Sequence, residues 1–295
     1  MVTWWIALGL CLLLVPTVLG AGPEPQTTIA APVTDAQRGV QRYSIESPFL
    51  SGKNVIEVLL PDKLEPGRKY RVLYVLPVDV GIGGQWGDAL MAVKKANTHN
   101  QHNLICVCPA FDTIPWFGAH ADNPRIRHED YLTKVVVPLV DRDFATMAKP
   151  DGRLLLGFSK SGCGAFTLLL RNPQTFGYAA SWDAPLMMRP SDLGKYGSKI
   201  HFGTPEQFAK YLPTELCKAQ AAALQAKTRL VLTGSDGFDK DTRGMHEWLT
   251  QLKVAHMYHP DWSYKHHWET GWVGPLADAL MALVEPPAAP KSLPN

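Results

Sequence analysis

The sequence has little net charge. Its 295 residues carry 29 Lys and Arg against 27 Asp and Glu, a formal net charge of +2. A chain so close to neutrality has no strong field for attracting nucleic acid or an anionic membrane surface. We therefore expect no nucleic-acid partner, and a small, near-neutral molecule as the ligand.

Cysteines and cofactor motifs are also scarce. Five cysteines in a chain of this length are too few for a disulfide framework. Cys106 and Cys108 alternate in the apolar run NLICVCP, so we expect buried thiols on one face of a strand. The phosphate-binding patterns GxxxxGK[ST] and GxGxxG are missing. His256 and His259 would face opposite sides of a strand, whereas zinc ligands must converge. The sequence thus predicts no cofactor and no metal.

The single long apolar run lies at the N-terminus. Residues 2–20 are almost wholly apolar and precede the turn-rich GPEPQTT, which is typical of a cleaved secretory signal. The run is also long enough to be an uncleaved membrane anchor. We expect a signal peptide over 1–21, a flexible linker over 22–40 and a disordered Pro-rich tail over 286–295. The protein would then be secreted or periplasmic, or else anchored to a membrane.

Between these ends, short apolar runs alternate with helical patterns, and no linker divides residues 41–285. This alternation predicts one α/β domain with a mostly parallel sheet and helices on both faces. The predicted strands are 54–61, 70–77, 103–109, 153–159, 177–183, 228–234 and 254–260. The predicted helices are 87–97, 129–144, 161–172, 204–212, 242–253 and 275–284, the second of them kinked at Pro138.

The stretch LLLGFSKSGCGAF indicates a strand, a sharp turn at Ser159 and a helix. Such a turn needs small residues two positions before and two after the serine, because its backbone is strained and closely packed. Gly157 fills the first position, and Ser161 stands where glycine is usual. The helix N-terminus would favour developing negative charge beside the Ser159 hydroxyl. The alternative is a glycine-rich loop that only joins strand to helix.

A nucleophilic serine needs a base and a carboxylate to orient it, here in the chain order serine, acid, histidine. Asp236 follows a predicted strand and a turn glycine, so it is the leading candidate for the acid. His266 and His267 lie in a loop before the last helix, where a base is expected. The other candidates for the acid are Asp183, Asp239 and Asp241.

Residues 50–285 resemble the putative esterase family of α/β-hydrolases, which includes esterase D, feruloyl esterases and acyl-carbohydrate esterases. The segments that carry the resemblance are YRVLYVLP, EDYLTKVVVPLVDRDF, GFSKSGCGAF, LLLRNPQTFGYAASWDAP and HHWETGW. The resemblance implies the α/β-hydrolase fold, with Ser159 as nucleophile and, more loosely, Asp236 as acid. It favours His266 as base, because that histidine is followed two positions later by Trp268.

The resemblance also implies two backbone N–H donors for an oxyanion. The first is that of Lys160. The second belongs to Val78 or Asp79, since LPVDVGIGG stands where relatives often carry a His-Gly pair. The implied activity is hydrolysis of a small carboxylic ester through an acyl-enzyme, with acyl-carbohydrate esters among the substrates. A peptidase or acyltransferase with the same triad and a non-catalytic binding module are the alternatives. Five aromatic residues could line a pocket or simply pack in the core: Trp86, Trp116, Phe117, Trp182 and Trp268.

Overall fold

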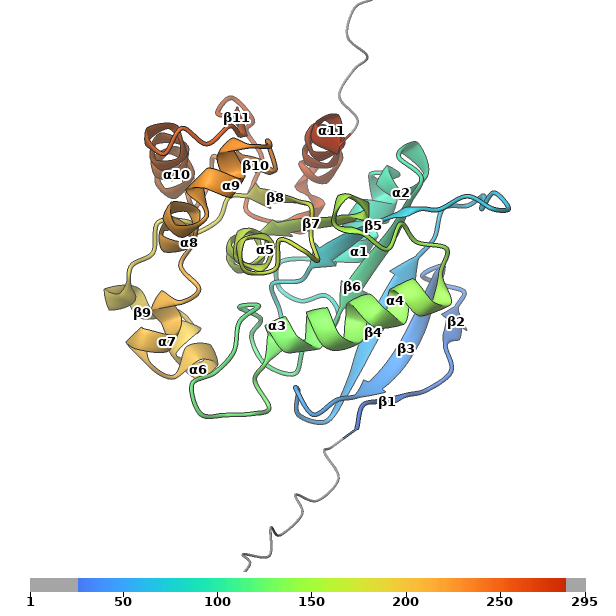
Figure 1. The fold of residues 1–295 in the computed structure, drawn as a ribbon. Coiled ribbons are helices and arrows are strands. Elements are labelled where there is room, and N and C mark those ends of the chain that lie inside the picture. Colours follow the sequence, from blue (N-terminus) through green and yellow to red (C-terminus); the bar gives the residue numbers. More distant parts are fainter. Residues whose placement is uncertain (1–25, 285–295) are drawn as a thin grey trace, which may run out of the picture.

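A ten-stranded sheet runs through the molecule (Figure 1). The computed structural model describes residues 26–284, so the predicted signal peptide and C-terminal tail lie outside the described residues. The strand order is β1-β3-β4-β6-β5-β7-β8-β10-β11, and β2 also pairs with β3. The strands are β1 (Thr28–Ile29), β2 (Val33–Asp35), β3 (Val40–Glu46), β4 (Lys53–Leu59), β5 (Arg71–Leu76), β6 (Leu104–Pro109), β7 (Arg153–Phe158), β8 (Tyr178–Trp182), β10 (Leu230–Thr233) and β11 (Met257–His259). A further strand, β9 (Leu193–Tyr196), lies outside this sheet.

The sheet is parallel from β6 to β11 and antiparallel at its other edge. Strands β6, β5, β7, β8, β10 and β11 pair in parallel in that order. Strands β1 to β4 and the β4–β6 pair are antiparallel. All seven predicted strands form, because continuous Val and Leu runs suit strands that are covered on both faces.

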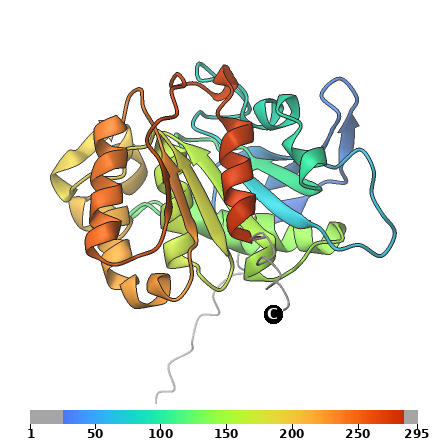
Figure 2. The ribbon, with the colours of Figure 1, turned by 90° about the horizontal axis from the view of Figure 1, so that it is seen from above.

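Helices cover both faces of the sheet (Figure 2). Along β5, Val72, Tyr74 and Leu76 enter one core, and Leu73 and Val75 enter the other. The first core packs under α4, α5, α8 and α10, and the second under α1 and α11. The helices are α1 (Ala89–Lys95), α2 (Thr98–Gln101), α3 (His128–Tyr131), α4 (Val137–Asp143), α5 (Lys160–Arg171), α6 (Ser198–Phe202), α7 (Pro205–Ala209), α8 (Pro213–Ala219), α9 (Ala221–Gln225), α10 (Asp239–Gln251) and α11 (Val273–Val284). In the described chain, no helix is both long and apolar enough to cross a membrane.

Part of the segment expected to be a flexible linker belongs to the sheet instead. Thr28–Ile29 and Val33–Asp35 pair with β3, which the sequence pattern also missed. These strands lie at the edge and lack long apolar runs, so their order comes from backbone pairing rather than from burial.

The helix expected over 129–144 is interrupted in an unexpected way. A π-helical turn, Leu132–Val136, joins α3 to α4, and the Val137 N–H donates to the Leu132 carbonyl five residues back. Pro138 follows directly and has no N–H to donate, so the wide turn carries the chain past the proline.

The thiols are buried, as the strand pattern predicts. Cys106, Cys108, Cys163 and Cys217 are free and enclosed in the core. Burial raises the pKa of the Cys163 thiol to about 12, so it stays protonated at neutral pH.

Candidate active site

Ser159 occupies a strained turn between β7 and α5. Its φ of 53° and ψ of −132° lie where non-glycine residues are rarely found. The Ser159 N–H donates to the Trp182 carbonyl at 3.0 Å, which ties the turn to the end of β8. Only 8% of the residue is exposed. The turn therefore holds the serine at the carboxyl end of β7, in the middle of the sheet, and at the N-terminus of a twelve-residue helix.

Neighbouring residues explain why the turn requires small side chains. A Cβ added at Gly157 would collide with the Ser161 carbonyl oxygen, and one at Gly162 would lie 2.5 Å from the Ser181 hydroxyl. The Ser161 hydroxyl accepts from the Phe158 N–H at 3.0 Å and donates to the Phe158 carbonyl at 2.9 Å. Ser161 thus closes the turn with two hydrogen bonds, a contribution that glycine at this position could not make.

The His266 imidazole is paired with Asp183. Nδ1 of the ring lies 2.6 Å from the Asp183 Oδ2, and this carboxylate is fully buried. It also accepts from the backbone N–H groups of Gly237 at 2.8 Å, Phe238 at 2.9 Å and Asp236 at 3.3 Å. Burial alone would raise the pKa of Asp183, but the hydrogen bonds from His266 and the backbone outweigh it and lower that pKa overall. Asp183 is therefore ionised at neutral pH and keeps a proton on Nδ1 of the ring.

Aromatic rings hold the imidazole beside the turn. The ring of Phe158, the residue before Ser159, lies 4.6 Å from that of His266 between centroids. Trp86 meets His266 edge-on at 5.1 Å, and Phe238 packs against it at 5.5 Å. This packing fixes the orientation of the ring whose Nδ1 faces Asp183.

Asp236, the acid expected from the sequence, contacts the backbone of His266 and not its ring. Its Oδ2 accepts from the His266 N–H at 2.8 Å, and its Oδ1 lies 3.6 Å from the Lys265 ammonium. Asp236 follows β10 and Asp183 follows β8, so both carboxylates lie at the same end of the parallel strands, but only Asp183 reaches the ring.

The remaining candidates lie elsewhere. Asp241 accepts from the Met187 N–H at 3.1 Å, and Asp239 is ion-paired with Arg243 at 2.9 Å. His267 Nδ1 accepts from the Glu269 N–H at 3.2 Å. His267 thereby caps a short 3-10 turn, while its neighbour faces Asp183.

The expected oxyanion donors lie in two loops that follow the neighbouring strands β7 and β5. Lys160 is the first residue of α5, so its N–H has no acceptor within the helix. Val78 is buried in the loop that follows β5, the other sheet neighbour of β7. In the same loop, Asp79 accepts from the Trp86 N–H at 3.3 Å. The two expected loops therefore lie on adjacent strand ends.

Most of the aromatic residues considered for a ligand pocket pack in the core. Trp116, Phe117, Trp182 and Trp268 are all at least 98% buried. Trp86 is only partly buried and touches the His266 ring. Within residues 26–284, no group of three or more His, Cys, Asp and Glu side chains is arranged to hold a metal ion.

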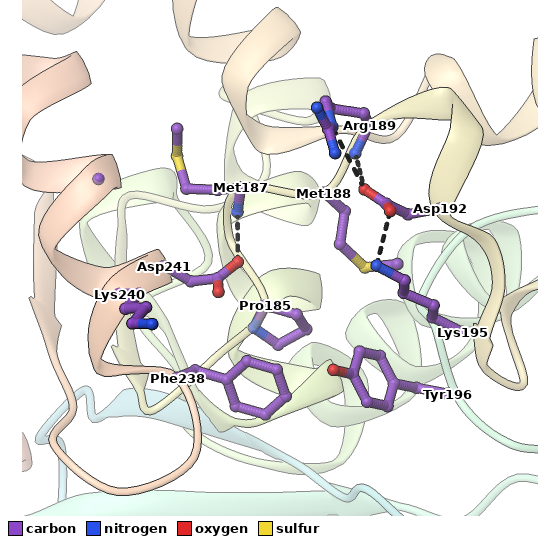
Figure 3. Close-up of a pocket in the computed structure, with 11 residues that line it drawn as sticks. Pro185, Met187, Met188, Arg189, Asp192, Lys195, Tyr196, Phe238, Lys240 and Asp241 are labelled. Atoms are coloured by element: carbon purple, nitrogen blue, oxygen red, sulfur yellow. Dashed lines mark hydrogen bonds and ion pairs between the residues drawn. The ribbon is translucent and has the colours of Figure 1, made fainter.

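A pocket of about 400 Å³ opens beside this site (Figure 3). Phe238, which packs on the His266 ring, forms part of its wall, and so does Pro185, two residues after Asp183. Its volume lies in the range of small-molecule sites.

Known proteins match this chain in sequence family and in fold. Residues 47–283 match the model of the family described as "Putative esterase". A search of curated proteins found no match. An S-formylglutathione hydrolase from Staphylococcus aureus has a TM-score of 0.64 at 16% identity, covering 88% of this chain and 100% of that one. A structure described as ferulic acid esterase has a TM-score of 0.60 at 16% identity, covering 88% and 98%. The S-formylglutathione hydrolase from Agrobacterium tumefaciens gives 0.63 at 16%, covering 87% and 98%. The fold is that of the α/β-hydrolases.

Proposed function

The chain belongs to the Putative esterase family of carboxylic ester hydrolases, and we propose that Ser159, His266 and Asp183 form the catalytic triad of this enzyme. The observation that carries the proposal is the 2.6 Å contact between His266 Nδ1 and the buried Asp183 carboxylate, beside the strained turn at Ser159. A carboxylate, an imidazole and a serine in this relation are the parts that nucleophilic acyl transfer requires.

The chemistry follows from the geometry. Ser159 Oγ attacks the ester carbonyl while His266 Nε2 takes its proton, and Asp183 keeps the other ring nitrogen protonated and stabilises the imidazolium. The oxyanion is held by the Lys160 N–H and by that of Val78 or Asp79, each contributing about 3 kcal/mol. The imidazolium then protonates the leaving alcohol, and water releases the acid from Ser159 by the same steps in reverse order.

Two finer features also belong to the proposal. The apolar run over 2–20 followed by GPEPQTT supports export to the periplasm or the medium, with a retained membrane anchor as the alternative. The substrate is a small ester. Ferulic acid esters are included because a similar structure is described as a ferulic acid esterase, and acyl-carbohydrate esters because the family resemblance implies them. Hydrolysis of methyl ferulate is a direct test of that substrate class.

A fluorophosphonate probe tests the nucleophile. We expect covalent labelling of the wild-type protein and none of Ser159→Ala. The expected control is Ser161→Ala, which keeps the nucleophile and stays labelled. If the protein were a non-catalytic binding module, neither the wild type nor Ser161→Ala would be labelled. Labelling that persists in Ser159→Ala would rule out this serine as the nucleophile.

Turnover of p-nitrophenyl acetate tests the choice of base. His266→Ala should lose about 10³-fold or more in kcat/KM, because the serine then lacks a proton acceptor. His267→Ala, one position away, keeps the pair with Asp183 and is expected to stay within about tenfold of wild type. The opposite ranking would assign the base to His267. If the enzyme were an acyltransferase, it would pass the acetyl group to an added alcohol in preference to water.

A further inference from the structure

The pocket beside the site carries information about the substrate, on the premise that the proposed triad is correct. Its wall begins at the triad itself, because the Phe238 N–H donates to Asp183 and the Phe238 ring packs on His266. A substrate limb that leaves the reacting carbonyl on this side would therefore enter the pocket.

About half of the pocket wall is apolar. Pro185, Met187 and Met188 line it (Figure 3). The rings of Phe238 and Tyr196, which also line it, meet edge-on with their centroids 5.4 Å apart. Tyr196 is 50% exposed and has a φ of 54°. A large ring that remains half in water at the edge of a cavity is available for contact with an apolar chain.

Charged groups surround these walls, and cations predominate. Arg189, Lys195 and Lys240 line the pocket together with only two carboxylates, Asp192 and Asp241. Asp192 is already engaged, with the Lys195 ammonium at 2.8 Å and the Arg189 Nε at 3.7 Å. One carboxylate shared by two cations leaves a positive excess on this side of the pocket.

The second carboxylate, Asp241, is held by the backbone. The Asp241 Oδ1 accepts from the Met187 N–H at 3.1 Å (Figure 3). Burial raises the pKa of Asp241, so the pocket disfavours its charged form. Lys240, the exposed neighbour of Asp241 in α10, is the third cation, so three cations face two carboxylates in the pocket lining.

We propose that this pocket binds a carboxylate carried on the acyl or the alcohol limb of the ester, with the apolar walls holding the chain that leads to it. The near-neutral charge of the whole chain does not oppose this, because complementarity depends on the charges that face the ligand.

Matched substrates test the proposal and distinguish its two sources. For the acyl limb, methylumbelliferyl hydrogen adipate is compared with its methyl ester, which has the same leaving group and no charge. For the alcohol limb, p-acetoxybenzoate is compared with its methyl ester. We expect the anionic member of one pair to have the higher kcat/KM, chiefly through a lower KM. Higher ionic strength should reduce the advantage, because the cations are solvent-exposed.

Variants place the effect in the pocket. An exposed ion pair changes binding by about 2- to 5-fold, so Lys240→Met and Arg189→Met should each lower the ratio of anionic to neutral kcat/KM by that factor. The double variant should lower it by the product. Lys199→Met is the matched control, because this exposed lysine of α6 does not line the pocket.

The outcomes separate this inference from the proposed function. A ratio near one in both pairs, or a ratio that Lys199→Met lowers as much as the pocket variants do, would overturn the carboxylate subsite while leaving the esterase intact. Failure of Ser159 to react with the fluorophosphonate would instead overturn the triad itself.

Discussion

Asp183→Asn is the substitution that bears most directly on the site, because it removes one charge and changes little else. The carboxylate accepts four hydrogen bonds: Oδ1 from the N–H groups of Asp236 and Phe238, and Oδ2 from Gly237 and the His266 ring. An asparagine side chain offers one acceptor oxygen and one NH₂ donor. Two of the four donors must therefore face another donor.

The loss can be worked out for each orientation of the amide. If its NH₂ faces His266, Nδ1 must become an acceptor, the ring proton moves to Nε2, and the ring cannot accept the proton of Ser159. A wrong tautomer of this kind costs on the order of 10⁴ in kcat, equivalent to about 5.4 kcal/mol in the barrier. If the amide is reversed, the partly buried N–H groups of Asp236 and Phe238 lose their acceptor, and each loss costs at most about 1–3 kcal/mol of folding stability.

The assay is p-nitrophenyl acetate turnover at pH 7, with urea unfolding to show that the variant is folded. Asp236→Asn is the matched control, because its remaining amide oxygen can still accept from the His266 backbone N–H. We expect this control to lose less than about tenfold. The reasoning would be refuted if Asp236→Asn lost about 10³-fold or more while folded Asp183→Asn retained most of its activity.

Three further predictions concern the turn and the interior. Ser161→Ala should lower the free energy of unfolding by about 1–3 kcal/mol in urea titrations, because the Phe158 N–H loses its buried acceptor; an unchanged midpoint would contradict this. Gly162→Ala should impair both stability and turnover, since its Cβ would lie 2.5 Å from a buried hydroxyl, whereas Gly274→Ala, with 3.7 Å of clearance, should be tolerated. Burial lowers the pKa of His201 from 6.5 to about 3. Because the unfolded state then binds the extra proton, stability is unaffected above pH 6.5 and falls below it, by roughly 3 kcal/mol at pH 4.5. His201→Gln should remove that part of the pH dependence.

The strained turn at Ser159 could be predicted from the sequence because its signals are local. The end of a buried strand, small residues two positions before and after Ser159 and the start of a helix pattern all lie within thirteen consecutive residues. Strain at one residue and close packing of its neighbours need no knowledge of distant segments. Most of the seven predicted strands could be recognised for the same reason, since their segments are short and mainly apolar.

Features that depend on pairing between distant segments were harder to predict. Strands β1 and β2 are held at the edge of the sheet by pairing with β3, and their short, partly exposed segments contain little apolar signal. Which carboxylate reaches the His266 ring likewise depends on contacts between loops that are far apart in the sequence. Asp183 is followed by Ala184 and Pro185, a sequence that is typical of an ordinary turn. Nothing in its local sequence therefore distinguished it as the residue that meets the imidazole.

Asp183 and Asp236 are nevertheless parts of one arrangement around His266. The backbone of residues 236–238 donates three N–H groups to Asp183, and the side chain of Asp236 accepts from the backbone N–H of His266. One loop therefore holds both the carboxylate that orients the imidazole and the chain that carries it. Phe238 extends the same loop into the wall of the adjacent pocket. A ligand in the proposed subsite would contact Phe238, whose N–H donates to Asp183 and whose ring packs on His266, so the proposed subsite and the proposed triad share one loop.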